Sequence, residues 1–242
     1  MNAVGGGPPF PTVTSPAAIL VAAGPGSRLG ADRPKALVDI AGAPLFVHAL
    51  RALIRAPSVG LVVVVAPPDH LDAAEAAVRS HGPWRAQVTV VAGGAERQES
   101  VRHGLEAIGD AAVVAIHDAA RPFVSADVVE AALAAAIRYG AAVVAVPATD
   151  TVKHVHPDGW IEATPPRQHM WLAQTPQVFQ ADLIRRAHAA APAAAATDDA
   201  LLVERLGTRV YVVRGNPENR KITTREDLRW AEWVLAQPPA AR

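Results

Sequence analysis

The chain has no cysteine at any of its 242 positions. This absence excludes disulfide bonds, thiolate metal sites and a cysteine nucleophile, and it is compatible with a reducing compartment, so we expect a cytoplasmic protein. No run of apolar residues reaches the about 18 that a membrane span needs. The first sixteen residues also lack the basic start and apolar core of a signal peptide, and we expect no membrane partner.

Charge of one sign is not in excess either, because 23 Lys and Arg balance 23 Asp and Glu. Without a net charge, no global field draws the protein to nucleic acid or to an anionic membrane, so any affinity for phosphate must be local. The nine histidines show no metal-ligand spacing. Among them, His117 is interpreted as a strand-end packing residue rather than a base.

Short Val-rich runs alternate with segments whose apolar residues recur at helical spacing. This alternation predicts one Rossmann-like α/β domain, with a mostly parallel twisted sheet and helices on both faces. The expected strands are 18–21, 60–66, 87–91, 112–116, 141–146 and 210–213. The expected helices are 44–56, 70–81, 99–108, 127–139, 181–190, 198–206 and a last one that begins near 224.

The alternation breaks at Pro147. Residues 148–176 scatter Pro, Thr, Asp and Gly among short alternating stretches, and Asp158-Gly159 predicts a hairpin turn within them. A loop of this length with its own hairpin is usually functional or an interface. We therefore expect a protruding β-hairpin arm for dimerisation. The expected boundaries are a disordered leader at 1–16, a domain at 17–237 and a tail at 238–242.

A glycine-rich turn follows the first expected strand. Gly24, Gly26 and Gly30 can bring main-chain N–H groups close to a polyanion, and Arg28 and Lys35 add positive charge. The spacing departs from the dinucleotide fingerprint, and the Gly-Lys-Ser/Thr of the NTPase phosphate loop is missing. The turn predicts a phosphate-binding loop; the alternative is an ordinary turn with a solvated basic pair.

Two more loops with unusual residues follow later strands. Residues 93–97 come after the third expected strand, with Ser100 close by, and residues 117–122 come after the fourth. In parallel sheets of this kind, ligands bind at the carboxyl ends of the strands. We therefore expect the three loops to converge on one site.

Residues 17–35 resemble the nucleotidyltransferase signature, A-A-G-x-G-x-R-x-G followed by P-K. Six further segments, in order, are similar to the 2-C-methyl-D-erythritol 4-phosphate cytidylyltransferase family: GGAERQESV, IHDAARPF, ATDTVK, QTPQVF, TDDALLVERLG and GNPENRKITTREDL. The resemblance covers about residues 17 to 235. It implies transfer of CMP from CTP to 2-C-methyl-D-erythritol 4-phosphate, with release of pyrophosphate, in isoprenoid precursor synthesis.

The resemblance also implies roles for single residues. Arg28, Lys35 and Lys221 would be catalytic through their contacts with phosphates, and Asp118 would hold Mg²⁺. The implied CTP-binding residues are Ala22, Ala23, Gly24, Gly26, Gly94, Ser100 and Ala119. The implied residues for the second substrate are Arg121, Thr151, Arg167 and Thr175. In the family the arm is exchanged between subunits, so a homodimer is implied.

Several of these assignments have alternatives. Asp118 could instead cap the turn that follows it, and Thr151 and Arg167 could be ordinary polar residues of the arm. Thr197-Asp198-Asp199 is interpreted as a helix N-cap with acidic residues in the first turn, rather than as a substrate contact.

One residue departs from the pattern of some relatives, which carry an acidic side chain where this chain has Ala95. The departure leaves the base-contacting loop with one carboxylate fewer. Two other functions stay open. One is a ribitol 5-phosphate cytidylyltransferase, and the other is a non-catalytic nucleotide-binding regulator on the same fold, although a sensor has no need of a full set of transition-state charges.

Overall fold

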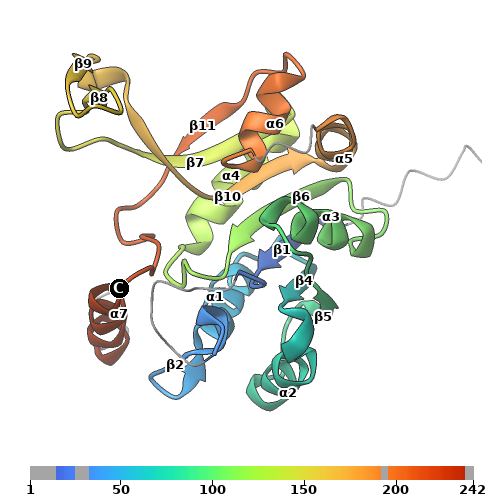
Figure 1. The fold of residues 1–242 in the computed structure, drawn as a ribbon. Coiled ribbons are helices and arrows are strands. Elements are labelled where there is room, and N and C mark those ends of the chain that lie inside the picture. The colour runs from blue at the N-terminus through green and yellow to red at the C-terminus, as the bar shows by residue number, and fades with distance from the viewer. Residues whose placement is uncertain (1–14, 25–32, 192–195, 238–242) are drawn as a thin grey trace, which may run out of the picture.

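The computed structural model describes residues 15–24, 33–191 and 196–237. The expected leader before residue 15, the expected tail, and Gly26, Arg28 and Gly30 of the glycine-rich turn lie outside these residues. Within the described part, a seven-stranded sheet has the order β11-β7-β10-β6-β1-β4-β5 (Figure 1). Its strands are β1 (Ala17–Val21), β4 (Leu61–Ala66), β5 (Gln87–Ala92), β6 (Val113–Asp118), β7 (Ala141–Pro147), β10 (Trp171–Gln180) and β11 (Tyr211–Arg214).

Seven α-helices and two small hairpins complete the described elements. The helices are α1 (Leu45–Ile54), α2 (Leu71–His81), α3 (Arg97–Ala107), α4 (Ala126–Tyr139), α5 (Ala181–Ala190), α6 (Asp199–Arg205) and α7 (Arg225–Ala236). The hairpins pair β2 (Asp39–Ile40) with β3 (Ala43–Pro44) and β8 (His154–Val155) with β9 (Ile161–Ala163). Short 3-10 turns lie at η2 (Lys35–Leu37), η3 (Pro68–His70) and η4 (Arg167–His169).

The sheet is mostly parallel, as predicted. β1 pairs in parallel with β4 and β6, β4 with β5, and β7 with β11. β10 is the exception, because it runs antiparallel to both of its neighbours, β6 and β7. The predicted extent of the arm, 148–176, is therefore wrong at its end: from Trp171 onward the chain belongs to the central sheet.

Helices cover both faces of the sheet, also as predicted. Apolar residues of α1, α2 and α4 pack on one face, where Phe46 and Leu133 are almost fully buried. Residues of α3, α5 and α6 pack on the other, around Phe179 and Ile184. Burying an apolar side chain of this size stabilises the fold by roughly 1.5–3 kcal/mol. The two layers therefore fix the central strands, whose carboxyl ends carry the loops of interest.

A capping box begins α7. The Thr224 hydroxyl accepts a hydrogen bond from the Asp227 backbone N–H, and the Asp227 carboxylate accepts one from the Thr224 backbone N–H. The Phe123 ring meets the Trp230 ring edge to face, at 5.2 Å between centroids, which docks α7 against the body. The start of α7 is thus fixed only a few residues after Lys221.

The β8–β9 hairpin stands away from the body of the molecule (Figure 1). Gly159 has a φ of 92° in its turn, a conformation that favours glycine. Apolar side chains on the hairpin are exposed, with Trp160 at 78% and Ile161 at 61%. The predicted turn and arm are therefore present, and their apolar surface is not covered by the described part of this chain.

Among the helices of the described residues, none has the length and apolar character that a membrane crossing requires.

Candidate active site

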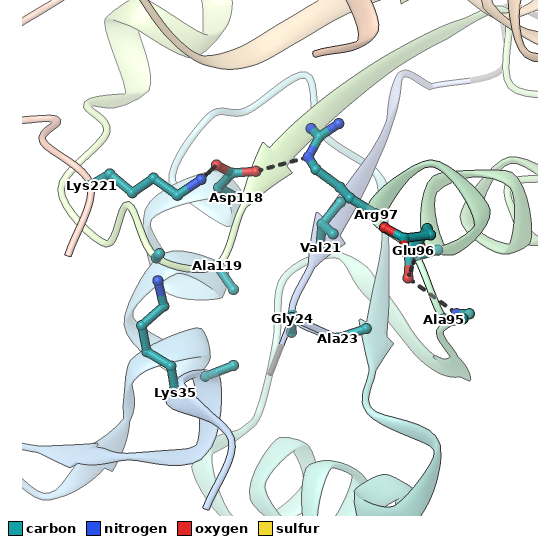
Figure 2. A pocket seen from close by; sticks show the side chains of 15 residues that line it. Val21, Ala23, Gly24, Lys35, Ala95, Glu96, Arg97, Asp118, Ala119 and Lys221 are labelled. Carbon is teal, nitrogen blue, oxygen red and sulfur yellow. Dashed lines mark hydrogen bonds and ion pairs between the residues drawn. The ribbon is translucent and has the colours of Figure 1, made fainter. Parts of the chain in front are cut away.

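A pocket of about 400 Å³ lies at the carboxyl ends of β1, β5 and β6 (Figure 2). The three loops that were predicted to converge do so there, and a fourth segment, between β11 and α7, adds Lys221. The predicted residues that line it are Ala22, Ala23, Gly24, Lys35, Gly94, Ser100, Asp118, Ala119 and Lys221. Other residues that line it were not assigned as site residues: Ala95, Glu96, Arg97 and Ala120, which belong to the predicted loops, and Val21 and Ala36.

The first two loops meet at a glycine. A Cβ atom at Gly93 would lie 2.3 Å from the Cβ of Ala23, so only glycine lets the loop after β5 approach the loop after β1 this closely. Ser100 then fixes the second loop, because its hydroxyl accepts a hydrogen bond from the Gly94 N–H and donates one to the Glu96 carbonyl. The pocket wall formed by these loops is therefore held by packing and by hydrogen bonds before any ligand binds.

Asp118 ends β6 and is 9% exposed. Its Oδ2 lies 2.6 Å from Lys221 Nζ, and its Oδ1 lies 3.6 Å from Arg97 Nε. Burial alone would raise the pKa of the Asp118 carboxyl, but Arg97 and Lys221 hold it well below its usual range. Asp118 is therefore an ionised carboxylate that faces the pocket between two cations (Figure 2).

Lys35 reaches the same pocket from η2. Its ammonium donates a 2.9 Å hydrogen bond to the carbonyl of Ile222, the residue that follows Lys221. Both lysines thus lie on one side of the pocket, opposite Gly24 (Figure 2). Such a grouping of ammonium groups, next to main-chain N–H groups of a glycine-rich turn, suits a polyphosphate. Arg28 and Gly26, predicted for the same role, lie outside the described residues.

His117 and Thr175 lie behind Asp118 and form a defined chain of hydrogen bonds. The Asp118 N–H donates to Thr175 Oγ1, which lies 3.0 Å from His117 Nδ1, and His117 Nε2 lies 2.9 Å from the Arg121 carbonyl. That carbonyl can only accept, so the proton is on Nε2, and the Thr175 hydroxyl donates to Nδ1. Burial lowers the pKa of His117 to about 4. The neutral ring is therefore a packing residue, as predicted.

The four residues expected to hold the second substrate do not line the pocket of this chain. Thr175 is 5% exposed, and its hydroxyl is engaged with His117 and Asp118. Arg121 donates to the Asn219 carbonyl at 2.7 Å. Thr151 and Arg167 lie exposed on the arm, where Arg167 donates to the Thr149 carbonyl at 2.7 Å. Their contact with a substrate stays a prediction.

Sequence reasoning placed Arg97 in a loop expected at the site but gave it no role, and it missed the full role of Asp199. Asp198 caps α6 as predicted, since its carboxylate accepts from the Leu201 N–H at 3.0 Å. Asp199, expected to be a first-turn charge, is instead 1% exposed and lies 2.7 Å from Arg97 Nη1. Its other oxygen accepts a 3.0 Å hydrogen bond from buried His188. No local pattern signals this contact, because its partners come from different elements.

The donor set fits a hard divalent cation held mainly by its substrate. Asp118 supplies an ionised carboxylate at the pocket wall, and among the described residues no group of three or more His, Cys, Asp or Glu side chains could form a complete protein cage. Mg²⁺ commonly uses one or two carboxylates, together with waters and substrate phosphates. A pocket with one carboxylate among cations that suit phosphates meets that requirement.

Residues 17–237 match the family model described as 2-C-methyl-D-erythritol 4-phosphate cytidylyltransferase. The chain is 45% identical over 222 residues to the protein of that name from Pelotomaculum thermopropionicum, covering 90% of this chain and 93% of the relative. It is 46% identical over 227 residues to the one from Geobacter metallireducens, covering 91% and 97%.

Solved structures agree with the sequence comparison. The crystal structure of 2-C-methyl-D-erythritol 4-phosphate cytidylyltransferase from Thermus thermophilus superposes with a TM-score of 0.72 at 36% identity, covering 90% of this chain and 97% of that one. The 4-diphosphocytidyl-2C-methyl-D-erythritol synthase from Anaerococcus prevotii superposes with a TM-score of 0.81 at 28% identity, covering 92% and 99%. The chain therefore belongs to the 2-C-methyl-D-erythritol 4-phosphate cytidylyltransferase family.

Proposed function

We propose that the pocket transfers CMP from CTP to 2-C-methyl-D-erythritol 4-phosphate, giving 4-diphosphocytidyl-2-C-methyl-D-erythritol and pyrophosphate. The observation that carries the proposal is the grouping of Lys35 and Lys221 in one pocket with the ionised Asp118, at the carboxyl edge of the sheet. This grouping supplies positive charge for two phosphate-bearing substrates. The specific reaction is the one in the name of the family to which the chain belongs.

In this reaction a phosphate oxygen of the methylerythritol phosphate attacks the α-phosphorus of CTP. The bond to the β-phosphate breaks in line and its electron pair leaves with pyrophosphate, so no protein nucleophile is needed. Lys35 and Lys221 would neutralise the charge that builds on the phosphate oxygens, and main-chain N–H groups at Gly24 would bind the triphosphate. Catalysis then depends on positioning two polyanions and on charge stabilisation.

We assign Mg²⁺ to Asp118, which would hold it together with triphosphate oxygens. The bound ion would supply charge neutralisation at those oxygens. Lys221 forms a 2.6 Å ion pair with the same carboxylate, so it would exchange this partner for phosphate when CTP binds. Asp118 thereby serves as an acceptor that keeps Lys221 in the pocket before the substrates arrive.

We assign the cytosine end to the second loop. The Gly94 N–H and the Ser100 hydroxyl already contact each other at 3.1 Å, and both line the pocket beside Ala95. Short-range polar contacts of this kind can distinguish one base edge from another, since an unmatched polar group is left without a partner. With alanine at position 95, selection would depend on main-chain groups and Ser100.

The binding site for the second substrate would be completed by the arm of a partner subunit. Thr151 and Arg167 do not line the pocket of their own chain, and the hairpin that carries them exposes Trp160 and Ile161. A two-stranded hairpin is marginal in water by itself, so packing on a second copy would stabilise it. We therefore propose a homodimer in which each arm serves the neighbouring site, with Arg121 beside it.

One experiment separates the candidate functions. Pyrophosphate release from CTP is measured with methylerythritol phosphate and, separately, with ribitol 5-phosphate. We expect turnover with the first and little with the second. Preferred turnover of ribitol 5-phosphate would assign the rival enzyme, and tight CTP binding without turnover of either would assign a nucleotide-binding regulator.

A further inference from the structure

One guanidinium is shared unequally between two carboxylates at the pocket. Arg97 Nη1 lies 2.7 Å from Asp199 Oδ2, whereas Arg97 Nε lies 3.6 Å from Asp118 Oδ1. The second separation exceeds hydrogen-bond length for an N–H donor and an oxygen acceptor. The close partner of Arg97 is therefore Asp199, on the helix layer behind the pocket, and not Asp118.

Asp199 is held firmly enough to compete for Arg97. It is 1% exposed, and its Oδ1 accepts a hydrogen bond from Nε2 of His188, itself 4% exposed. The Asp199 N–H donates to Gln177 Oε1 at 3.0 Å, which ties the start of α6 to β10. A buried carboxylate that lost its cation would be left as an uncompensated charge at high cost. Separating the Arg97 guanidinium from Asp199 would therefore be strongly unfavourable.

Asp118 would otherwise be a natural partner for the same guanidinium. An arginine and a carboxylate prefer a close, bidentate contact when nothing restrains them. Here Lys221 Nζ pairs with Oδ2 at 2.6 Å, whereas Arg97 Nε stays 3.6 Å from Oδ1, an ion pair that is longer than a hydrogen bond. In Figure 2 the Arg97 guanidinium points away from Gly24 and Lys35.

We infer that Asp199 is a positioning residue for cytidylyl transfer: it holds the Arg97 guanidinium off Asp118 and so keeps Asp118 Oδ1 open to the Mg²⁺ and triphosphate side of the pocket. The inference rests on the proposed function. It assigns Arg97 a place beside the carboxylate rather than on the nucleotide. It also gives His188, which the reaction does not use, a part in holding Asp199.

The first test is Asp199→Asn, which keeps an oxygen for His188 but removes the charge that holds Arg97. Arg97 then closes onto Asp118 and competes with Mg²⁺. We expect kcat to fall about 10- to 100-fold, the usual loss for a residue that orients a ligating group. Calorimetry of CTP binding should show that the gain in affinity from Mg²⁺ falls about tenfold, while affinity without Mg²⁺ stays within about twofold.

The second test is Arg97→Lys, at a side chain that lies at the pocket wall. A lysine ammonium lacks the planar fork that spans two carboxylates, and it should remain with the buried Asp199. We expect the gain in CTP affinity from Mg²⁺ to be retained or increased. Loss of CTP affinity with and without Mg²⁺ would instead mean that Arg97 binds the nucleotide directly, and it would overturn the inference. This variant decides the matter even where Asp199→Asn does not fold.

The matched control is Arg102→Gln on the same helix, α3, where the exposed Arg102 pairs with Glu99 at 3.8 Å. It should leave kcat, CTP affinity and the thermal midpoint unchanged. A folded Asp199→Asn protein with a normal gain from Mg²⁺, or with equal losses in both CTP titrations, would contradict the inference. A wild-type protein that releases no pyrophosphate would contradict the proposed function instead, and the CTP titrations would still test Asp199.

Discussion

Lys221 Nζ lies 2.6 Å from Asp118 Oδ2, although 103 positions separate the two residues. The contact joins the segment before α7 to the end of β6, so one ion pair at the pocket links the middle of the chain to a segment near its end. Arg97 and Lys221 also keep Asp118 ionised. A triphosphate that enters the pocket must therefore compete with a carboxylate for Lys221.

Replacement of Lys35 by alanine should lower kcat by about 10²- to 10³-fold, because one preorganised charge at a reacting centre is lost. Pyrophosphate release at saturating CTP measures the change. The matched control is Arg79→Ala, which removes an exposed cation paired with Glu75 on α2 and should leave turnover unchanged. Near-normal turnover of a folded Lys35→Ala protein would remove the phosphate contact from the mechanism. The same loss is expected for Arg28→Ala.

Activity should require a divalent cation. Chelation should abolish pyrophosphate release, and Asp118→Asn should raise the Mg²⁺ concentration for half-maximal rate, because a neutral amide is a poorer ligand for a hard cation. Asp72→Asn, at an exposed position in the first turn of α2, is a control that changes an acidic side chain outside the pocket and should leave the Mg²⁺ dependence unchanged. Full turnover in excess chelator, or unchanged Mg²⁺ dependence in Asp118→Asn, would count against the assignment.

Two inactive variants should complement each other if the arm is exchanged. A heterodimer of Lys35→Ala and Arg167→Ala contains one site in which both residues are wild type, so mixing should restore part of the activity. Lys35→Ala mixed with Lys221→Ala is the matched control, because both residues line the same pocket and no intact site can form. Subunits that exchange but regain nothing, or a fully active monomer by light scattering, would defeat the homodimer proposal.

Asp227 should make stability depend on pH. Burial would raise its pKa, but hydrogen bonds from Thr223 and Thr224 hold it well below its ordinary value of 3.8. Because the unfolded chain binds the proton more readily, this contribution is full above pH 3.8 and is lost as the pH falls. Asp227→Asn should lower the free energy of unfolding by about 1–2 kcal/mol at pH 7.

Urea unfolding of the wild type and of Asp227→Asn at pH 7, 5 and 3.5 measures this effect. The difference in the free energy of unfolding between the two proteins should be constant from pH 7 to 5 and smaller at pH 3.5. Asp182→Asn, an exposed first-turn residue of α5, is the control and should shift stability by far less. A difference that grows toward low pH would contradict the assignment.

Helices and strands whose apolar residues recur with a clear period were predicted well. The bounds predicted for α5 agree with the structure, and the strands at the edge of the pocket are within two residues of their predicted ends, because buried runs flanked by turn residues are locally encoded. β10 was missed for a physical reason. Pro176 lies inside it, and its pairing with β7 shifts register between Ala173 and Gln177, so the segment has no regular strand pattern.

The candidate site was predicted in part for the same reason. Lys35, Asp118 and Lys221 belong to short motifs that can be read from the sequence, and all three line the pocket. The Arg97–Asp199 contact joins α3 to α6 through tertiary packing, and a local pattern of charges cannot distinguish such a contact from an ordinary acidic first turn.

The position of β10 has a consequence for the order in which the protein folds. β1, β4, β5 and β6 are neighbours of one another, but β7 and β11 reach them only through β10. During synthesis, β1, β4, β5 and β6 can therefore pair early. β7, which begins at Ala141, can join them only after β10, which begins at Trp171, has been made. Lys221 follows β11, so the half-sheet that carries the glycine loop can form before the last cation of the pocket has left the ribosome.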